Sequence, residues 1–234
     1  MTREFAAGNY RFIPAVFQYS GGAAADPDYE IERVRFDRLL PLAEGFVQAA
    51  RFIREAGRPL TAFCACELRS PAAFTEEGFR AFNLHYVKTL AEWGIFDGTT
   101  NPVARSNVCP EIDPPSEPSF HAFSFTRATR SNSPSFVIAG GAEAREGTGS
   151  YVERTVRYRD LSPEGLREKV RFTTSQMETR MAAFGFGLAA DDECAGLFGA
   201  RLPSCVGRRT GPPRRTAFGP DLALRAAARH RSRI

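Results

Sequence analysis

A strand-like segment that ends in a glycine pair occurs twice in this chain, and this repeat constrains the fold more than any other feature. Residues 17–25 (FQYSGGAAA) are matched by residues 136–144 (FVIAGGAEA). A segment with period-two alternation follows each copy, and a helix-like segment then opens near Pro41 and again near Ser162. The copies are offset by roughly 120 residues throughout, which indicates an internal duplication. We therefore expect two similar tandem lobes.

Extended and helical patterns alternate along the first copy. Pro14 marks a bulge or edge in the first strand, and Gly21-Gly22 is expected to end it. Thr75 is the expected N-cap of the second helix. Because both helices follow strands, we expect an α+β fold with the helices on one face of the sheet. Strands are predicted at residues 10–20, 29–36, 60–68, 104–108 and 120–125, and helices at residues 41–56 and 74–93.

The second copy is incomplete. Residues 151–158 match the strand at 29–36 and are predicted to be a strand, and residues 162–184 are predicted to be a helix. From about residue 189 no period-two run occurs, and only residues 221–228 have the pattern of a short helix. The predicted division is a first lobe at 1–128, a partial second lobe at 129–188 and an irregular tail rich in Arg, Gly, Pro and Ala at 189–234.

The tail carries an unusual charge. From Cys194 onward it holds nine arginines, no lysine and one acid, Asp221, so its net charge is +8 and the preceding residues carry −4 of the total of +4. One interpretation is a basic tail for nucleic acid or membrane. We prefer the hypothesis that the tail is an out-of-frame translation of a GC-rich gene after about residue 188, which would produce this composition.

Composition excludes several classes of protein. A hydrophobic content of 43% and a charged content of 25% are typical of a soluble globular chain. No apolar run reaches the ~20 residues of a membrane span, and the N-terminus lacks a signal-peptide pattern. We therefore expect a cytoplasmic protein that binds neither membrane nor, given its acidic body, nucleic acid. The five cysteines are expected to be free thiols, and three histidines make a metal site improbable on composition.

Arg105 is the leading candidate for a binding residue. It follows a turn-rich loop and stands at the start of a strand-like segment, ARSNV at 104–108. Its guanidinium is planar, permanently charged and forked, so it suits bidentate binding of a carboxylate. The alternative is a surface or interface salt bridge, which is the commoner role of arginine.

Three motifs resemble the Rid (YjgF-like) superfamily of imine and enamine deaminases: Tyr19-Ser20-Gly21-Gly22, Phe82-Asn83, and Ala104-Arg105-Ser106-Asn107-Val108. The resemblance covers residues 10–125 and, more weakly, 135–188. The chain looks most similar to the two-lobed 2-aminomuconate-type deaminases, because of the Phe12-Ile13-Pro14 motif and the segments at 61–70 and 94–115.

The resemblance implies two chorismate-mutase-like lobes, each a curved mixed sheet backed by two helices. It also implies chemistry without a cofactor and active clefts between neighbouring units, so that a homo-oligomer, such as a trimer, is expected. The family's carboxylate-binding arginine falls on Arg105. Its water-positioning glutamate falls where this chain has Phe120 and His121, which is a departure from the family pattern.

The implied reaction is hydrolytic deamination of 2-aminomuconate or 2-amino-5-chloromuconate to the 2-oxo acid and ammonia in aromatic-compound degradation. Alternatives are a chorismatase-like hydrolase and a non-catalytic module that binds a carboxylate or imine. Glu67, at the end of a strand, is either an acid/base or an ion-pair partner of Arg69. The expected roles are carboxylate binding by Arg105 and Ser106, proton transfer by Glu67 or His121, and substrate contact by Tyr19 and Cys109.

Overall fold

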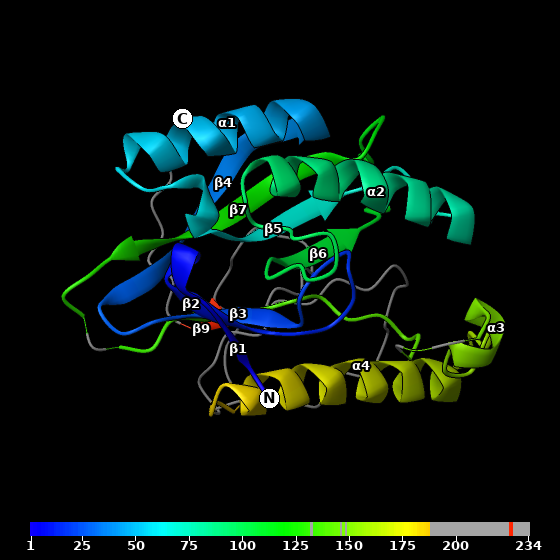
Figure 1. Cartoon of the computed structure of the whole chain (residues 1–234). Coiled ribbons are helices and arrows are strands. Elements are labelled where there is room, and N and C mark those ends of the chain that lie inside the picture. The colour runs from blue at the N-terminus through cyan, green and yellow to red at the C-terminus, as the bar shows by residue number, and fades with distance from the viewer. Residues whose placement is uncertain (132, 146, 148, 188–224, 227–234) are drawn as a thin grey trace, which may run out of the picture.

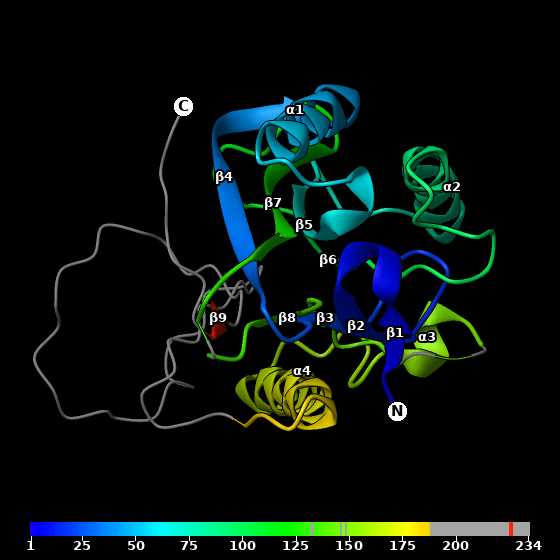
Figure 2. The ribbon, with the colours of Figure 1, turned by 60° about the vertical axis from the view of Figure 1, so that its left-hand side comes forward.

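The computed structural model describes residues 1–131, 133–145, 147, 149–187 and 225–226. Two β-sheets lie face to face in the middle of the molecule, with helices on the outer side of each (Figure 1). Helices α1 (Leu42–Glu55) and α2 (Glu76–Glu92) cover one sheet, and α4 (Pro163–Ala183) covers the other (Figure 2). The expected α+β class is confirmed, with both early helices on one face of one sheet.

The sheet beneath α1 and α2 positions the candidate site. Its strand order is β4-β7-β5-β6. All pairs are antiparallel except β5 and β6, which are parallel and are connected through α2. The four strands are β4 (Tyr29–Pro41), β5 (Phe63–Arg69), β6 (Ala104–Val108) and β7 (Ser119–Ala128).

Aromatic rings fill the core between this sheet and its two helices. Phe46 of α1 packs edge-on against Phe120 and lies 5.7 Å from the ring of Tyr86 on α2. A Cβ atom at Gly45 would collide with the Phe120 ring, so this glycine allows α1 to approach the sheet closely. Phe123 and Phe125 of β7 reach this core through the period-two pattern of the strand. Phe120 reaches it because the register of the β5–β7 pair shifts beside it.

The second sheet has the strand order β1-β2-β3-β8-β9, and each neighbouring pair of strands is antiparallel. α4 packs on it through a small apolar cluster that includes Phe136, Met177, Met181 and Phe184. This sheet combines strands from the N-terminal part of the chain with β8 from beyond residue 128. The strands are β1 (Arg3–Phe5), β2 (Tyr10–Ile13), β3 (Gly22–Ala25), β8 (Phe136–Ile138) and β9 (Arg225–Ala226).

The helix predictions are confirmed to within about two residues, and Thr75 caps α2 by accepting a hydrogen bond from the Gly78 N–H at 3.0 Å. The first strand was predicted too long. β2 ends at Ile13 because Pro14 cannot donate to the ladder, and Gly22 begins β3 instead of ending a strand.

The strand that the repeat predicts at residues 151–158 does not form. The structure forms α3 (Tyr151–Arg154) and a turn there, because Ser150 and Glu153 make a capping box that starts a helix. Arg225–Ala226 pairs with β8, so it is not the short helix predicted for 221–228. The rest of the predicted tail lies outside the described residues. Within the described part, no helix is both long and apolar enough to cross a bilayer.

Candidate active site

Arg105 lies in β6 with its guanidinium under α2. Only 4% of the residue is exposed. The guanidinium carbon lies 4.7 Å from the ring centroid of Tyr86, 5.5 Å from that of Phe82, 5.9 Å from that of Phe79 and 5.3 Å from that of Tyr19. Three of these rings come from α2, and the fourth comes from the segment that leads into the first glycine pair. We call these four rings the aromatic box.

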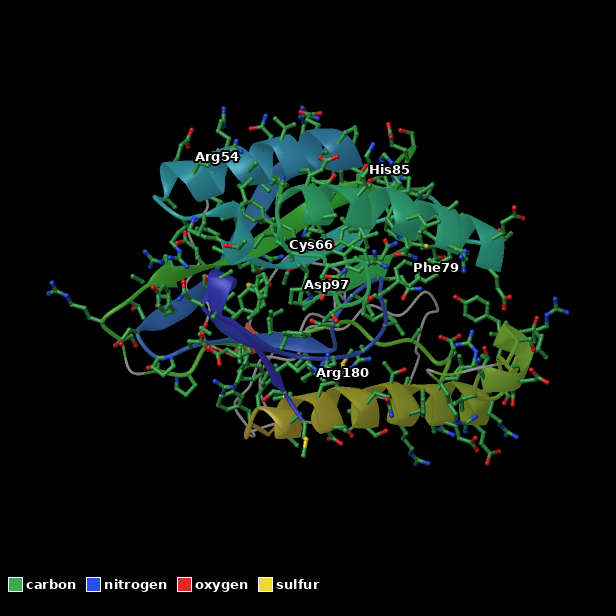
Figure 3. All side chains as sticks on the ribbon, viewed as in Figure 1. Arg54, Cys66, Phe79, His85, Asp97 and Arg180 are labelled. Carbon is green, nitrogen blue, oxygen red and sulfur yellow. The ribbon has the colours of Figure 1, made fainter. Side chains whose placement is uncertain are left out.

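The register of the parallel β5–β6 pair explains this orientation. Arg105 is paired with Cys66, and paired residues project from the same face of a sheet. The Cys66 sulfur lies 3.3 Å from the Tyr86 hydroxyl, and Figure 3 shows Cys66 beneath α2 with His85 on the outer side of that helix. Burial raises the pKa of Cys66 to about 12, although the Arg105 charge opposes the rise. Burial likewise raises the pKa of Tyr86, so both groups are protonated at neutral pH.

Among the residues that the structure describes, no carboxylate pairs with the guanidinium in the aromatic box. Its Nη1 is buried and finds no hydrogen-bond partner among the described residues. Leaving a buried cation without a counter-ion costs several kcal/mol. Cation–π contacts offset only about 1–2 kcal/mol of this free-energy cost. The arrangement is therefore suited to binding an anionic ligand, which must part the surrounding side chains to reach Nη1.

Asn83 on α2 belongs to the Phe82-Asn83 motif, but the sequence analysis assigned it no role in the site. It is fully buried, and its Nδ2 donates to the Phe79 carbonyl at 2.6 Å. Its Oδ1 accepts no hydrogen bond from any residue with a described position. The signal in the sequence was an amide at a position where the apolar face of the helix should continue, between Phe79 and Tyr86.

Glu67 lies on the opposite face of the same sheet. It follows Cys66 in β5, so its side chain points away from α2. Its carboxylate accepts two hydrogen bonds from Arg33, one from Nε and one from Nη2 at 2.7 Å. Burial alone would raise the pKa of Glu67, but the bonds and charge of Arg33 outweigh burial and lower it. The expected alternative partner, Arg69, instead donates to the Leu68 carbonyl.

The other predicted site residues divide between these two faces. Tyr19 joins Arg105 in the aromatic box. Ser106 is paired with Glu67 and so faces away from the guanidinium. His121 is half-buried and close enough to Glu67 for its positive charge to lower the pKa of that carboxyl. Cys109 is exposed just beyond β6. In one chain, Ser106, Glu67 and His121 thus lie on the side of the sheet away from the Arg105 guanidinium. Their expected roles in carboxylate binding and proton transfer stay predictions.

A small cavity lies between the two sheets on the Glu67 side. Its volume of about 30 Å³ has room for a water molecule. Arg105 borders it as well, with its guanidinium on the α2 side. The polar and backbone groups around it come from both sheets and include Glu67, Ser106, Ser124, Ala139 and Gly140.

Both glycine-pair segments meet at the free edge of β6. The Ser20 N–H donates to the Val103 carbonyl at 2.8 Å, and the Gly140 N–H donates to the Arg105 carbonyl at 3.2 Å. A Cβ atom at Gly140 would lie 3.1 Å from the Cβ of Ser106, so a larger residue would crowd this edge. The repeated motif therefore builds the surroundings of Arg105 from both halves of the chain. Among the residues with described positions, no cluster of three His, Cys, Asp or Glu side chains is arranged to hold a metal ion.

Comparison with known proteins identifies the family of the chain. A family model described as 2-aminomuconate deaminase CnbZ matches residues 2–195. A 2-amino-5-chloromuconate deaminase from Comamonas testosteroni is 55% identical over 187 residues, which are 79% of this chain and 74% of the relative. No solved structure matches the chain. This chain belongs to the CnbZ family of 2-aminomuconate deaminases.

Proposed function

We propose that this protein hydrolyses the enamine of 2-aminomuconate or 2-amino-5-chloromuconate to the corresponding 2-oxo acid and ammonia in aromatic-compound degradation. The observation that carries the proposal is the Arg105 guanidinium, which is buried in an aromatic box without a counter-ion from the described part of the chain. A substrate carboxylate supplies the missing charge, and the flat conjugated chain suits the surrounding rings. The identity to a relative named for this activity supports the same class of substrate.

The reaction needs a proton shift, a water molecule and a leaving amine. Moving a proton from nitrogen to carbon converts the enamine to an imine, and C2 becomes electrophilic. Water adds at C2, and the protonated nitrogen then leaves as ammonia, which balances one water consumed against one ammonia released. Arg105 holds the carboxylate next to C2 and disperses negative charge there.

Glu67 and His121 are the two candidates for moving protons. We propose that Glu67 serves mainly to hold Arg33, because a carboxyl with a lowered pKa is a poor proton donor at neutral pH. His121 remains the candidate for proton transfer, and in one chain it lies behind the sheet from the Arg105 guanidinium. A cleft between two copies would remove that separation, so we propose a homo-oligomer, with a trimer as the form expected for the family.

The two-lobed description also stays a proposal. The unit at 1–128 holds the complete sheet β4-β7-β5-β6 with α1 and α2. β8 and α4 belong to the partial unit at 129–188, and the repeat of the glycine pair supports their common origin. We further propose a cytoplasmic location and a tail at 189–234 that belongs to neither repeat, although its residues Arg225–Ala226 pair with β8.

The test is release of ammonia by the full chain. Incubation with 2-aminomuconate, and separately with its 5-chloro analogue, should release one ammonia for each enamine consumed. Binding of the substrates without ammonia release would support the binding-module alternative. Release of pyruvate from chorismate, with no ammonia from the enamines, would support the chorismatase-like alternative and contradict the proposal.

A further inference from the structure

Two buried polar atoms of opposite character lack partners in the layer between α2 and β6. Arg105 Nη1 is a hydrogen-bond donor and Asn83 Oδ1 is an acceptor, and neither is bonded to a described residue. Asn83 is fully buried, and Arg105 is 4% exposed. Folded proteins leave few buried polar atoms unpaired, so two in one layer require an explanation.

Asn83 lies on the face of α2 that carries two of the rings around the guanidinium. Asn83 comes four residues after Phe79 and three before Tyr86, so the three side chains share one face of the helix. The rings of Phe79 and Tyr86 both lie within 5.9 Å of the guanidinium carbon of Arg105. The bond from Asn83 Nδ2 to the Phe79 carbonyl fixes the amide and leaves Oδ1 as its available atom.

We propose that Arg105 and Asn83 together bind the amino end of the substrate, where one carbon carries both a carboxylate and an amino group. This inference rests on the proposed function and adds an orientation to it. The carboxylate accepts hydrogen bonds from the guanidinium, and an N–H of the amino or imino group donates to Asn83 Oδ1. Both orphaned atoms are then satisfied by neighbouring groups of one ligand.

The pairing determines which end of the dicarboxylate is recognised. The carboxylate at the far end of the molecule has no N–H beside it, so it satisfies Arg105 but leaves Asn83 unpaired. The bound orientation therefore holds C2, the carbon that water attacks, next to the Arg105–Asn83 pair. A site that hydrogen-bonds a substrate N–H also discriminates against analogues that lack it.

The experiment compares 2-aminomuconate as substrate with cis,cis-muconate as a competitive inhibitor, because muconate has both carboxylates and no amino group. Replacing Asn83 with leucine (Asn83→Leu) removes the acceptor at similar volume. We expect kcat/KM for 2-aminomuconate to fall by about tenfold to a hundredfold. The inhibition constant of muconate should stay within about twofold or improve, because muconate leaves the Asn83 acceptor unpaired.

A second variant tests whether the two atoms converge. In Asn83→Asp the new carboxylate would pair with the guanidinium and compete with any anionic ligand, so both 2-aminomuconate and muconate should bind at least about tenfold more weakly. His85→Leu, on the exposed face of α2, is the matched control and should leave both constants unchanged. A cooperative melt of each full-chain variant confirms that it is folded.

Equal losses for both ligands in Asn83→Leu, or no loss for either, would overturn the orientation while the proposed function stood. Unchanged muconate inhibition in Asn83→Asp would overturn it too, because the two atoms would then not share a ligand. Absence of turnover by the unmodified protein would instead remove the proposed function and this inference with it.

Discussion

Arg105 is paired with Cys66 across the parallel strands β5 and β6, so the guanidinium and the thiol project together toward α2. One residue further along, Ser106 is paired with Glu67, and these side chains project toward the other sheet. A shift of one residue thus separates the buried cation from the ion-paired carboxylate. Within the described part of the chain, this separation keeps the Glu67 carboxylate away from the Arg105 guanidinium, which can then bind a substrate anion.

Replacing Arg105 with methionine (Arg105→Met) should stabilise the fold and abolish activity. Removing an unpaired buried charge while keeping the packing volume is expected to raise the free energy of unfolding by about 1–3 kcal/mol. Chemical denaturation and a thermal melt measure this change. A variant that lost stability and kept its turnover would show that the arginine has a structural role.

Arg58 provides a matched control for that variant. It also stacks on an aromatic ring, 4.8 Å from the centroid of Tyr29, but it has acceptors: the Thr126 carbonyl at 3.0 Å and Asn9 Oδ1 at 2.6 Å. Arg58→Met leaves these acceptors without a hydrogen-bond donor, so the variant should have a lower free energy of unfolding and an unchanged kcat/KM. Opposite signs of the two stability changes would distinguish Arg105, which binds a ligand, from Arg58, which stabilises the fold.

Glu67→Gln should change the response of stability to acid. A carboxyl whose folded pKa lies below its unfolded value of about 4.3 contributes stability above that value, and the contribution is lost as the pH falls through the folded pKa. The variant should therefore be less stable at pH 7, where Arg33 loses its counter-charge, and its stability should fall less steeply below about pH 5. Denaturation midpoints between about pH 3 and pH 7 measure the two slopes.

Activity of Glu67→Gln at neutral pH separates a structural from a catalytic role. If Glu67 mainly holds Arg33, turnover by the folded variant should stay within about threefold of the unmodified enzyme. A loss of turnover beyond about a hundredfold in a folded variant would instead assign proton transfer to this carboxylate.

Tyr86→Phe and Tyr86→Leu distinguish the ring of Tyr86 from its hydroxyl. Phenylalanine keeps the ring next to the guanidinium and removes the bond to Cys66, so activity should be nearly unchanged and stability should fall by about 1 kcal/mol or less. Leucine removes the cation–π contact, and the KM for 2-aminomuconate should rise several-fold. Steady-state kinetics with both variants would contradict this account if the phenylalanine variant were the more impaired.

The sequence predicted the strands and helices around Arg105 because alternation and capping are local signals. The Thr75 cap is confirmed for this reason. Phe123 and Phe125 alternate as predicted, whereas Phe120 joins the same core cluster through a register shift in the β5–β7 pair. Even the opposed faces of Arg105 and Ser106 follow from neighbouring positions in a strand. That both side chains contact one carboxylate stays a prediction, and within one chain they project from opposite faces of the sheet.

Other features depended on contacts that no local pattern contains. The parallel register that pairs Arg105 with Cys66 rather than Glu67 joins strands that are separated in the chain by α2, so no tight turn specifies it. The partnership of Glu67 with Arg33 joins β5 to β4 across the width of β7. At residues 151–158 the repeat was a weaker determinant than the capping box of Ser150 and Glu153.

The most direct test of the central claim is calorimetric titration of cis,cis-muconate into the unmodified protein and into Arg105→Met. Muconate offers a carboxylate and undergoes no deamination, so the heat reports anion binding alone. The account predicts saturable binding to the unmodified protein and none to Arg105→Met at the same concentrations. Equal affinity of the two proteins for muconate would show that the buried guanidinium is not where the substrate carboxylate binds.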